Sequence, residues 1–226
     1  MGSPEMGTAL AHLTATPAKA GRTIIAYALD ESGSMEACQE AVRSGFAEFL
    51  ATLRRIAGAD RAAFFLVKFN TAVLPVHRGL PLAAVPDLTP ETYQPGGMTA
   101  LYDAVMQVVR GVDQELTAED RVLVIVHTDG QENSSHRHAK ADVAEAIKER
   151  EARGTWTFVY LGADQDAWSE SVGLGMAGAN AASYQASAAG TRGAYRRMAR
   201  STASWMAAQA AAPQPFWLDD DEADRS

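Results

Sequence analysis

The sequence has little cysteine, no long apolar run and fewer basic than acidic residues. Cys38 is its only cysteine, so no intrachain disulfide can form and nothing points to an oxidising compartment. No apolar stretch approaches the roughly 20 residues that a membrane helix requires. The 20 basic and 28 acidic side chains give a net charge of −8, whereas phosphate-backbone binding needs a basic surface. We therefore expect a cytoplasmic protein that binds neither membrane nor nucleic acid.

The overall composition is typical of one compact domain with an N-terminal arm and a C-terminal tail. Apolar residues make up 47% of the 226 residues and charged residues 21%, enough for a full core. We expect a flexible arm over 1–20, which lacks the cationic start and apolar block of a signal peptide. One domain is expected over 21–212. A tail over 213–226 is first rich in proline and aromatic residues and then acidic.

Strand and helix patterns alternate along the predicted domain. Continuous β-branched and aromatic runs predict strands buried on both faces of a parallel sheet, and apolar residues at helical spacing follow them. A run after Asn70-Thr71 can return as an antiparallel edge strand. The pattern predicts an α/β fold with a doubly wound, mostly parallel central sheet, one antiparallel edge strand and helices on both faces. The expected strands are 23–29, 62–69, 72–77, 122–126 and 155–161, and the expected helices are 38–56, 101–112, 139–153, 166–172 and a last one around 195–206.

The tail holds half of the charge imbalance. Residues 219–226 contain five acidic side chains and one arginine. The tail could be a solvated segment or could dock on a partner. A third possibility is internal, because Arg192, Arg196 and Arg200 would form one basic stripe on the last helix. The Pro-aromatic stretch around Trp217 could likewise dock on the domain or on a partner.

Oxygen-bearing side chains follow the predicted strands where ligands bind in open α/β sheets. Asp30, Ser32 and Ser34 alternate in the turn after the first strand. A Pro/Gly loop brings Thr99 to the start of a helix, and Asp129 follows the strand 122–126. Two carboxylates and three hydroxyls form an all-oxygen set that suits hard cations, Mg²⁺ first and Mn²⁺ or Ca²⁺ as substitutes.

These motifs, D-x-S-x-S at 30–34, Thr99 after a Gly-rich loop and T-D-G at 128–130, resemble those of the von Willebrand factor A domain. Further segments, including F-V-Y-L-G-A-D-Q-D-A and T-D-G-Q-E-N-S-S, are similar to a bacterial stand-alone subgroup. The resemblance covers about residues 22–195 and implies a Rossmann-like fold with a metal-ion-dependent adhesion site. It implies that Ser32, Ser34 and Thr99 are hydroxyl ligands, and that Asp30 and Asp129 bind directly or through water. Met98 and His127 depart from the family pattern.

The resemblance implies a protein-interaction module, not an enzyme. The metal would bind an Asp or Glu carboxylate of a partner, for which an ATPase of the AAA+ type or another complex member is a candidate. The physical argument agrees, because neutral hydroxyls leave the cation able to attract an incoming acid. The set also lacks a nucleophile paired with a base.

Other interpretations compete for the same residues. A metal-dependent phosphoester hydrolase of the haloacid dehalogenase type would use Asp30, but it needs a second acid where Ser32 stands. Asp30 or Ser34 could be simple helix caps. His136 and His138, near His127 in sequence, could suggest zinc but lack a third fixed ligand.

Overall fold

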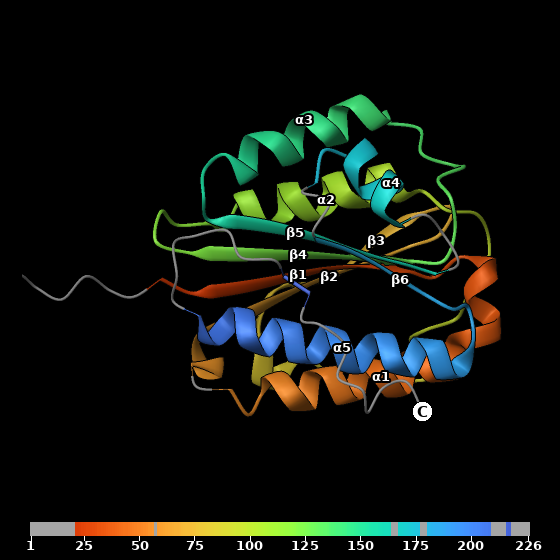
Figure 1. Cartoon of the computed structure of the whole chain (residues 1–226), viewed down its shortest axis with the longest axis horizontal. Helices are drawn as coiled ribbons and strands as arrows, with labels where there is room; N and C mark the ends of the chain where they lie inside the picture. The colour runs from red at the N-terminus through yellow and green to blue at the C-terminus, as the bar shows by residue number, and fades with distance from the viewer. Residues whose placement is uncertain (1–20, 57, 164–166, 177–179, 209–215, 218–226) are drawn as a thin grey trace, which may run out of the picture.

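A computed structural model describes residues 21–56, 58–163, 167–176, 180–208 and 216–217, and Figure 1 shows its six-stranded sheet between two layers of helices. The strands lie in the order β3-β2-β1-β4-β5-β6. The strands are β1 Thr23–Asp30, β2 Ala62–Phe69, β3 Val73–Pro81, β4 Arg121–Thr128, β5 Trp156–Ala163 and β6 Ala181–Tyr184. The α-helices are α1 Gln39–Leu53, α2 Leu101–Asp113, α3 Lys140–Glu151, α4 Ala167–Gly173 and α5 Ala188–Ala207, and short 3-10 helices are η1 Gly33–Cys38, η2 Ala59–Arg61 and η3 Leu82–Ala84.

The sheet is parallel except at one edge, as the sequence predicts. β1 pairs in parallel with both β2 and β4. The parallel pairing continues from β4 to β5 and from β5 to β6. β3 runs antiparallel to β2. Asp30 stands opposite Phe69, and Leu29 opposite His127. The strands β1, β2 and β4 therefore end at one edge of the sheet.

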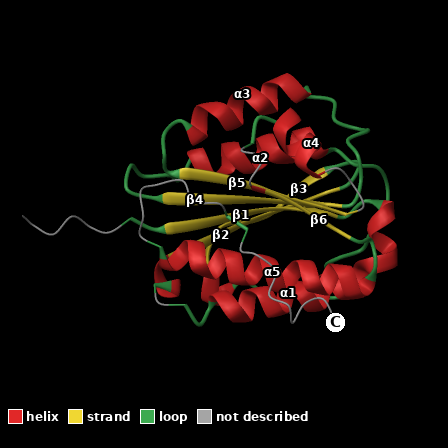
Figure 2. Ribbon diagram, viewed as in Figure 1, coloured by secondary structure: helices red, strands yellow, loops and turns green. Residues whose placement is uncertain are grey.

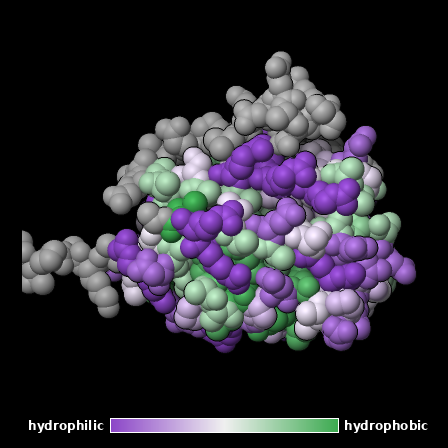
Figure 3. Space-filling view, turned by 90° about the horizontal axis from the view of Figure 1, so that it is seen from below, coloured by the Kyte–Doolittle hydropathy of each residue, from purple (hydrophilic) through white to green (hydrophobic). Residues whose placement is uncertain are grey.

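Helices cover both faces of the sheet, with α1 and α5 on one and α2, α3 and α4 on the other (Figure 2). The inner strands are buried almost throughout, which explains their unbroken apolar runs. Figure 3 looks onto the face of α1 and α5, where hydrophilic side chains alternate with small apolar patches. None of the helices in the described part of the chain combines the length and apolarity that a membrane span needs.

Two features of the C-terminal part were open or absent in the sequence analysis. β6 was not predicted, because four residues, A-A-S-Y, are too short to show an alternation and follow a glycine-rich segment. Phe216 and Trp217 join the core on the α1/α5 face, with exposed fractions of 3% and 8%. These two residues thus dock on the domain itself. The arm 1–20 and the acidic residues 218–226 lie outside the described residues.

A glycine of α1 sets how closely α1 and α5 approach. A Cβ added at Gly45 would lie 2.4–2.8 Å from atoms of the Tyr195 side chain, which is fully buried. Gly193 on α5 differs, because an added Cβ would meet nothing closer than the Arg196 guanidinium at 4.0 Å.

These two glycines should respond oppositely to the same substitution. Gly45→Ala should lower the free energy of unfolding by about 1–3 kcal/mol, because overpacking outweighs the gain in helix propensity. Gly193→Ala should raise it by up to about 1 kcal/mol, because only the propensity changes. Urea unfolding of both variants measures this, and equal effects of the two would contradict the packing described for Gly45.

Candidate metal centre

Asp30 ends β1 as a carboxylate with no exposed surface. Its Oδ1 accepts the backbone N–H of Ser32 at 2.7 Å, and its Oδ2 accepts the Thr128 hydroxyl at 2.5 Å. Thr128 is the last residue of β4, so this bond joins the ends of two neighbouring strands. Ser32 precedes the first turn of η1 but makes no side-chain capping bond there. Helix capping therefore does not account for the Ser32 hydroxyl.

Three hydroxyls, one from the turn after β1, one from η1 and one from the loop before α2, surround one point next to Gly130. A Cβ added at Gly130 would lie 2.9 Å from Thr99 Oγ1, 3.6 Å from Ser34 Oγ and 3.7 Å from Ser32 Oγ. Ser32 and Thr99 are buried, whereas Ser34 is exposed. The cradle is therefore built of hydroxyls and opens towards solvent on one side.

Asp129 completes the set. Its Oδ1 accepts the Ser34 hydroxyl at 2.5 Å, and Ser34 Oγ lies 3.1 Å from Ser32 Oγ. The structure thus brings together all five residues that the sequence singles out: Asp30, Ser32, Ser34, Thr99 and Asp129. Asp129 is also close enough to contribute to the raised pKa of Asp30.

The loop that carries Thr99 is tied to the Asp30 turn by backbone hydrogen bonds. Gly33 N–H donates to Gly97 O at 3.1 Å, and Gly96 N–H donates to Glu31 O at 2.9 Å. Gly97 has a φ of 81°, a conformation that suits glycine. The Thr99 N–H donates to Asn133 Oδ1 at 2.8 Å, which joins the loop after β4 to the same assembly. Met98 is 48% exposed and does not keep the Thr99 hydroxyl from the site.

A buried ion pair that the sequence analysis missed connects the same loops. Lys68 Nζ lies 2.8 and 2.9 Å from the two carboxylate oxygens of Glu31 and donates to Thr92 O at 2.6 Å. Glu31 also accepts the Gln94 N–H at 2.7 Å. Both charged residues are over 90% buried. The pair fixes the Pro/Gly loop against the β1 turn at the base of the cradle.

Burial sets the protonation of Asp30. Removal from water raises the pKa of its carboxyl from 3.8 to about 6. Hydrogen bonds from Thr128 and Ser32 lower the pKa and offset part of this effect, and the neighbouring Asp129 raises it. A carboxylate held in this way lacks a positive charge, which a bound cation would supply.

His127 has a structural role beside the site. It is fully buried, and burial lowers its pKa to about 3. Its Nδ1 lies 3.2 Å from the Tyr27 hydroxyl and 3.3 Å from the Tyr195 hydroxyl, and its Nε2 lies 2.8 Å from the Tyr184 hydroxyl. His127 is therefore a neutral, hydrogen-bonded core residue.

The zinc interpretation gains no support. His138 uses Nδ1 with Asp103 and Nε2 with Arg110, each at 2.8 Å. His127 is enclosed by tyrosines. Among the described residues, no three His, Cys, Asp or Glu side chains form a group that could hold a metal. A hydroxyl-rich site with two carboxylates is a different donor set, and its oxygens fit a hard divalent cation such as Mg²⁺.

The comparisons identify the fold. No protein-family model and no curated protein matches the sequence. A von Willebrand factor type A structure from Catenulispora acidiphila matches with a TM-score of 0.55 and 17% identity, over 81% of this chain and 43% of that chain. The pilus adhesin SpaC from Lactobacillus rhamnosus GG matches with a TM-score of 0.61 and 15% identity, over 81% and 31%.

A third match was solved with a metal in place. Proximal thread matrix protein 1 from the mussel byssus, with zinc in its metal-ion-dependent adhesion site motif, matches with a TM-score of 0.56 and 16% identity, over 81% and 46%. The chain spans less than half the length of each of these three proteins. At such identities the likeness shows the fold, and this chain has the fold of a von Willebrand factor A domain.

The pKa of Asp30 predicts how the metal-free protein responds to pH. The folded state binds the Asp30 proton more tightly than the unfolded chain does, so the charged carboxylate costs stability above pH 6. This cost disappears as the pH falls towards 3.8. Asp30→Asn should therefore raise the free energy of unfolding at pH 8 by up to about 3 kcal/mol in the absence of divalent metal, and by much less near pH 4.

Asp120→Asn is the matched control. Hydrogen bonds from Arg22 and Thr117 outweigh burial and lower the pKa of Asp120. That substitution should destabilise the protein at pH 8, with a smaller effect in acid. Chemical unfolding at several pH values, with a metal chelator present, measures both. A loss of stability in Asp30→Asn that is largest at pH 8 would contradict the prediction.

The Glu31–Lys68 pair predicts a second stability series. Lys68→Met should cost about 3–5 kcal/mol, because it leaves a buried, unpaired carboxylate. Glu31→Gln combined with Lys68→Met should recover most of that loss, because neither side chain is then charged. The exposed Arg153–Glu149 pair provides the control, and Arg153→Met should cost less than about 1 kcal/mol. A double variant as unstable as Lys68→Met would show that burial of charge is not the cause.

Proposed function

We propose that this protein is a divalent-metal-dependent protein–protein interaction module. Asp30, Ser32, Ser34, Thr99 and Asp129 would hold the ion, and the ion would bind a carboxylate of a partner protein. The convergence of three hydroxyls beside Gly130 carries the proposal. The zinc reported in the adhesion-site motif of the mussel matrix protein lends support from the same fold.

The donor set explains why such a site would bind rather than catalyse. Three of the five side chains are neutral, so they leave much of the charge of a divalent ion uncompensated and available to an incoming acid. The cradle opens at exposed Ser34 and partly exposed Asp129, where a partner can reach it. A bound metal would supply the positive charge, and the five side chains would hold it in position.

A phosphoester hydrolase of the haloacid dehalogenase type is the weaker alternative. Its acid two positions after Asp30 is replaced by Ser32, which contributes a hydroxyl to the cradle. His127 is enclosed by tyrosines and neutral, so it cannot serve as a base for Ser34. Solved structures with this fold include a pilus adhesin and a byssus matrix protein, which favours a role in binding over catalysis.

The finer parts of the proposal rest on the donor set, on the composition and, for the partner, on the resemblance. Mg²⁺ is the proposed ion, with Mn²⁺ or Ca²⁺ as substitutes. The proposed partner is an AAA+ ATPase or another member of a complex that offers an Asp or Glu. We further propose a cytoplasmic bacterial protein with an arm over 1–20, a domain over 21–212 and a tail over 213–226.

Filling the cradle tests the metal site without removing any of the five side chains. Gly130→Ala should weaken Mg²⁺ or Mn²⁺ binding by about tenfold or more, because its Cβ occupies the point that the hydroxyls share. Gly96→Ala is the control, because an added Cβ there meets nothing within 4 Å. Calorimetric titration of both variants and of Thr99→Ala measures this, and unchanged affinity in Gly130→Ala and Thr99→Ala would overturn the site.

Replacing the two carboxylates of the site separates binding from catalysis. If the proposal is correct, pull-down of partners from a lysate should require divalent metal and fail with Asp129→Ala, and a generic phosphoester screen with Mg²⁺ or Mn²⁺ should find no turnover. Turnover that Asp30→Ala abolishes would instead establish the hydrolase.

A further inference from the structure

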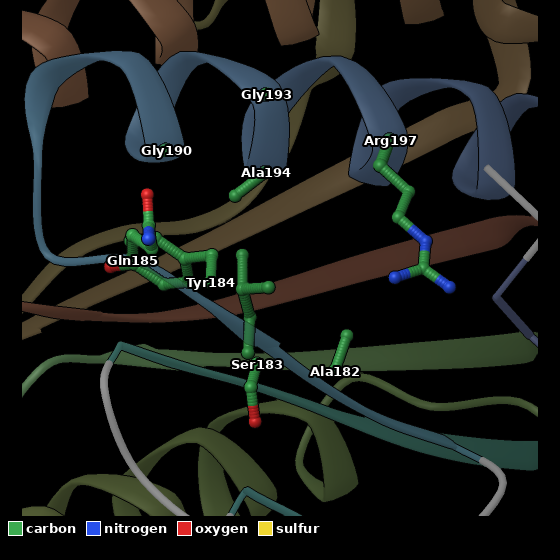
Figure 4. A pocket seen from close by; sticks show the side chains of 9 residues that line it. Ala182, Ser183, Tyr184, Gln185, Gly190, Gly193, Ala194 and Arg197 are labelled. Atoms are coloured by element: carbon green, nitrogen blue, oxygen red, sulfur yellow. The ribbon is translucent and has the colours of Figure 1, made fainter. Parts of the chain in front are cut away.

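A groove lies between the edge strand β6 and helix α5. It has a volume of about 370 Å³, and Figure 4 shows the side chains of β6 and α5 around it. Small residues leave it open: Gly193 and Ala194 from α5 and Ala182 from β6. Arg197 borders it as a charged side chain. β6 is the last strand of the sheet, so the groove runs beside a strand edge.

The helix that forms one wall of this groove is strongly basic. α5 carries Arg192, Arg196, Arg197 and Arg200 and no acidic residue over its 20 positions. Arg192 and Arg196 are exposed, and the other two are half-buried. A charge of +4 on one helix is unusual in a chain whose net charge is −8. Of the four arginines only Arg197 lines the groove itself, and the positive charge of the whole helix favours an acidic ligand beside it.

The chain itself returns to this groove just before its acidic segment. The Phe216 N–H donates to Asn180 Oδ1 at 3.3 Å, immediately before β6 begins. The guanidinium carbon of Arg197 lies 5.4 Å from the centre of the Trp217 ring. Both aromatic residues are buried, so they anchor the chain beside the groove. Residues 218–226, L-D-D-D-E-A-D-R-S, follow directly and carry a net charge of −4.

We propose that the groove between β6 and α5 is a binding site for an extended acidic segment, and that its occupant is residues 218–226 of the same chain. Nine extended residues reach up to about 30 Å, while the α5 wall from Arg197 back to Gly190 is only about 10 Å long. The net charges of the segment and the helix, −4 and +4, are equal and opposite. An exposed strand edge is also prone to pair with other chains, and a segment lying along β6 prevents this.

Hydrogen exchange of the full-length protein tests the occupant. Replacing Asp219, Asp220 and Asp221 by Asn should make the backbone amides of 181–185 exchange about fivefold faster, because several ion pairs are lost together. Raising the ionic strength to about 1 M should have the same effect on the unaltered protein but little further effect on the variant. The control removes three exposed acids from other surfaces, Asp87, Glu119 and Glu145, as Asn or Gln, and should leave this exchange unchanged.

Blocking the groove provides an independent test. Gly193→Leu should place its side chain in the groove and speed exchange at 181–185 as tail neutralisation does, whereas Gly193→Ala should have little effect. No change in exchange on neutralising 219–221 would overturn the proposal. A change that depends on protein concentration, with dimers in light scattering, would also overturn it in favour of the segment of a second copy. Neither result bears on the metal site.

Discussion

The candidate site depends on burying a carboxylate at the end of β1. Asp30 has no exposed surface, and its two oxygens accept hydrogen bonds from Ser32 and Thr128. These bonds fix the turn after β1 and join it to the end of β4. Burial raises the pKa of the carboxyl, and these bonds, which supply no positive charge, lower it only in part. Keeping a buried carboxylate charged costs folding free energy, and a cation bound beside Asp30 would offset that cost.

Much of this arrangement could be predicted because a parallel sheet converts sequence order into position. Unbroken apolar runs mark the inner strands, and strands that run in parallel end at one edge. Asp30 and Asp129 each stand at such an end, so their proximity followed once the strands were recognised. Thr99 was harder, because a long loop delivers it. The Gly-rich motif before Thr99 indicated that this residue belongs to the site, whereas hydrophobic periodicity gave no such signal.

The interactions that hold the loops could not be read from local pattern. Lys68 lies in an apolar strand and Glu31 within a turn, and 37 positions separate them. Nothing in the spacing says that they pair, because the contact exists only after β2 has aligned with β1. The same holds for Asn133, whose side-chain oxygen accepts a hydrogen bond from the backbone N–H of Thr99, 34 residues away. β6 escaped detection for another reason, because a four-residue edge strand owes its form to pairing with β5.

The charge distribution also constrains how an acidic partner could be recognised. This chain has a net charge of −8, so it offers acidic groups no long-range attraction. Its repulsion of them is weak beyond the Debye length of about 8–10 Å, because salt screens it. Recognition of acids must then come from concentrated local positive charge. The arginines of α5 are one such source, and a cation in the cradle would be another. If residues 218–226 neutralise the arginines within the chain, the metal centre remains as the surface at which an external carboxylate gains most. The acidic tail would in this way direct acidic partners to the carboxyl edge of the sheet.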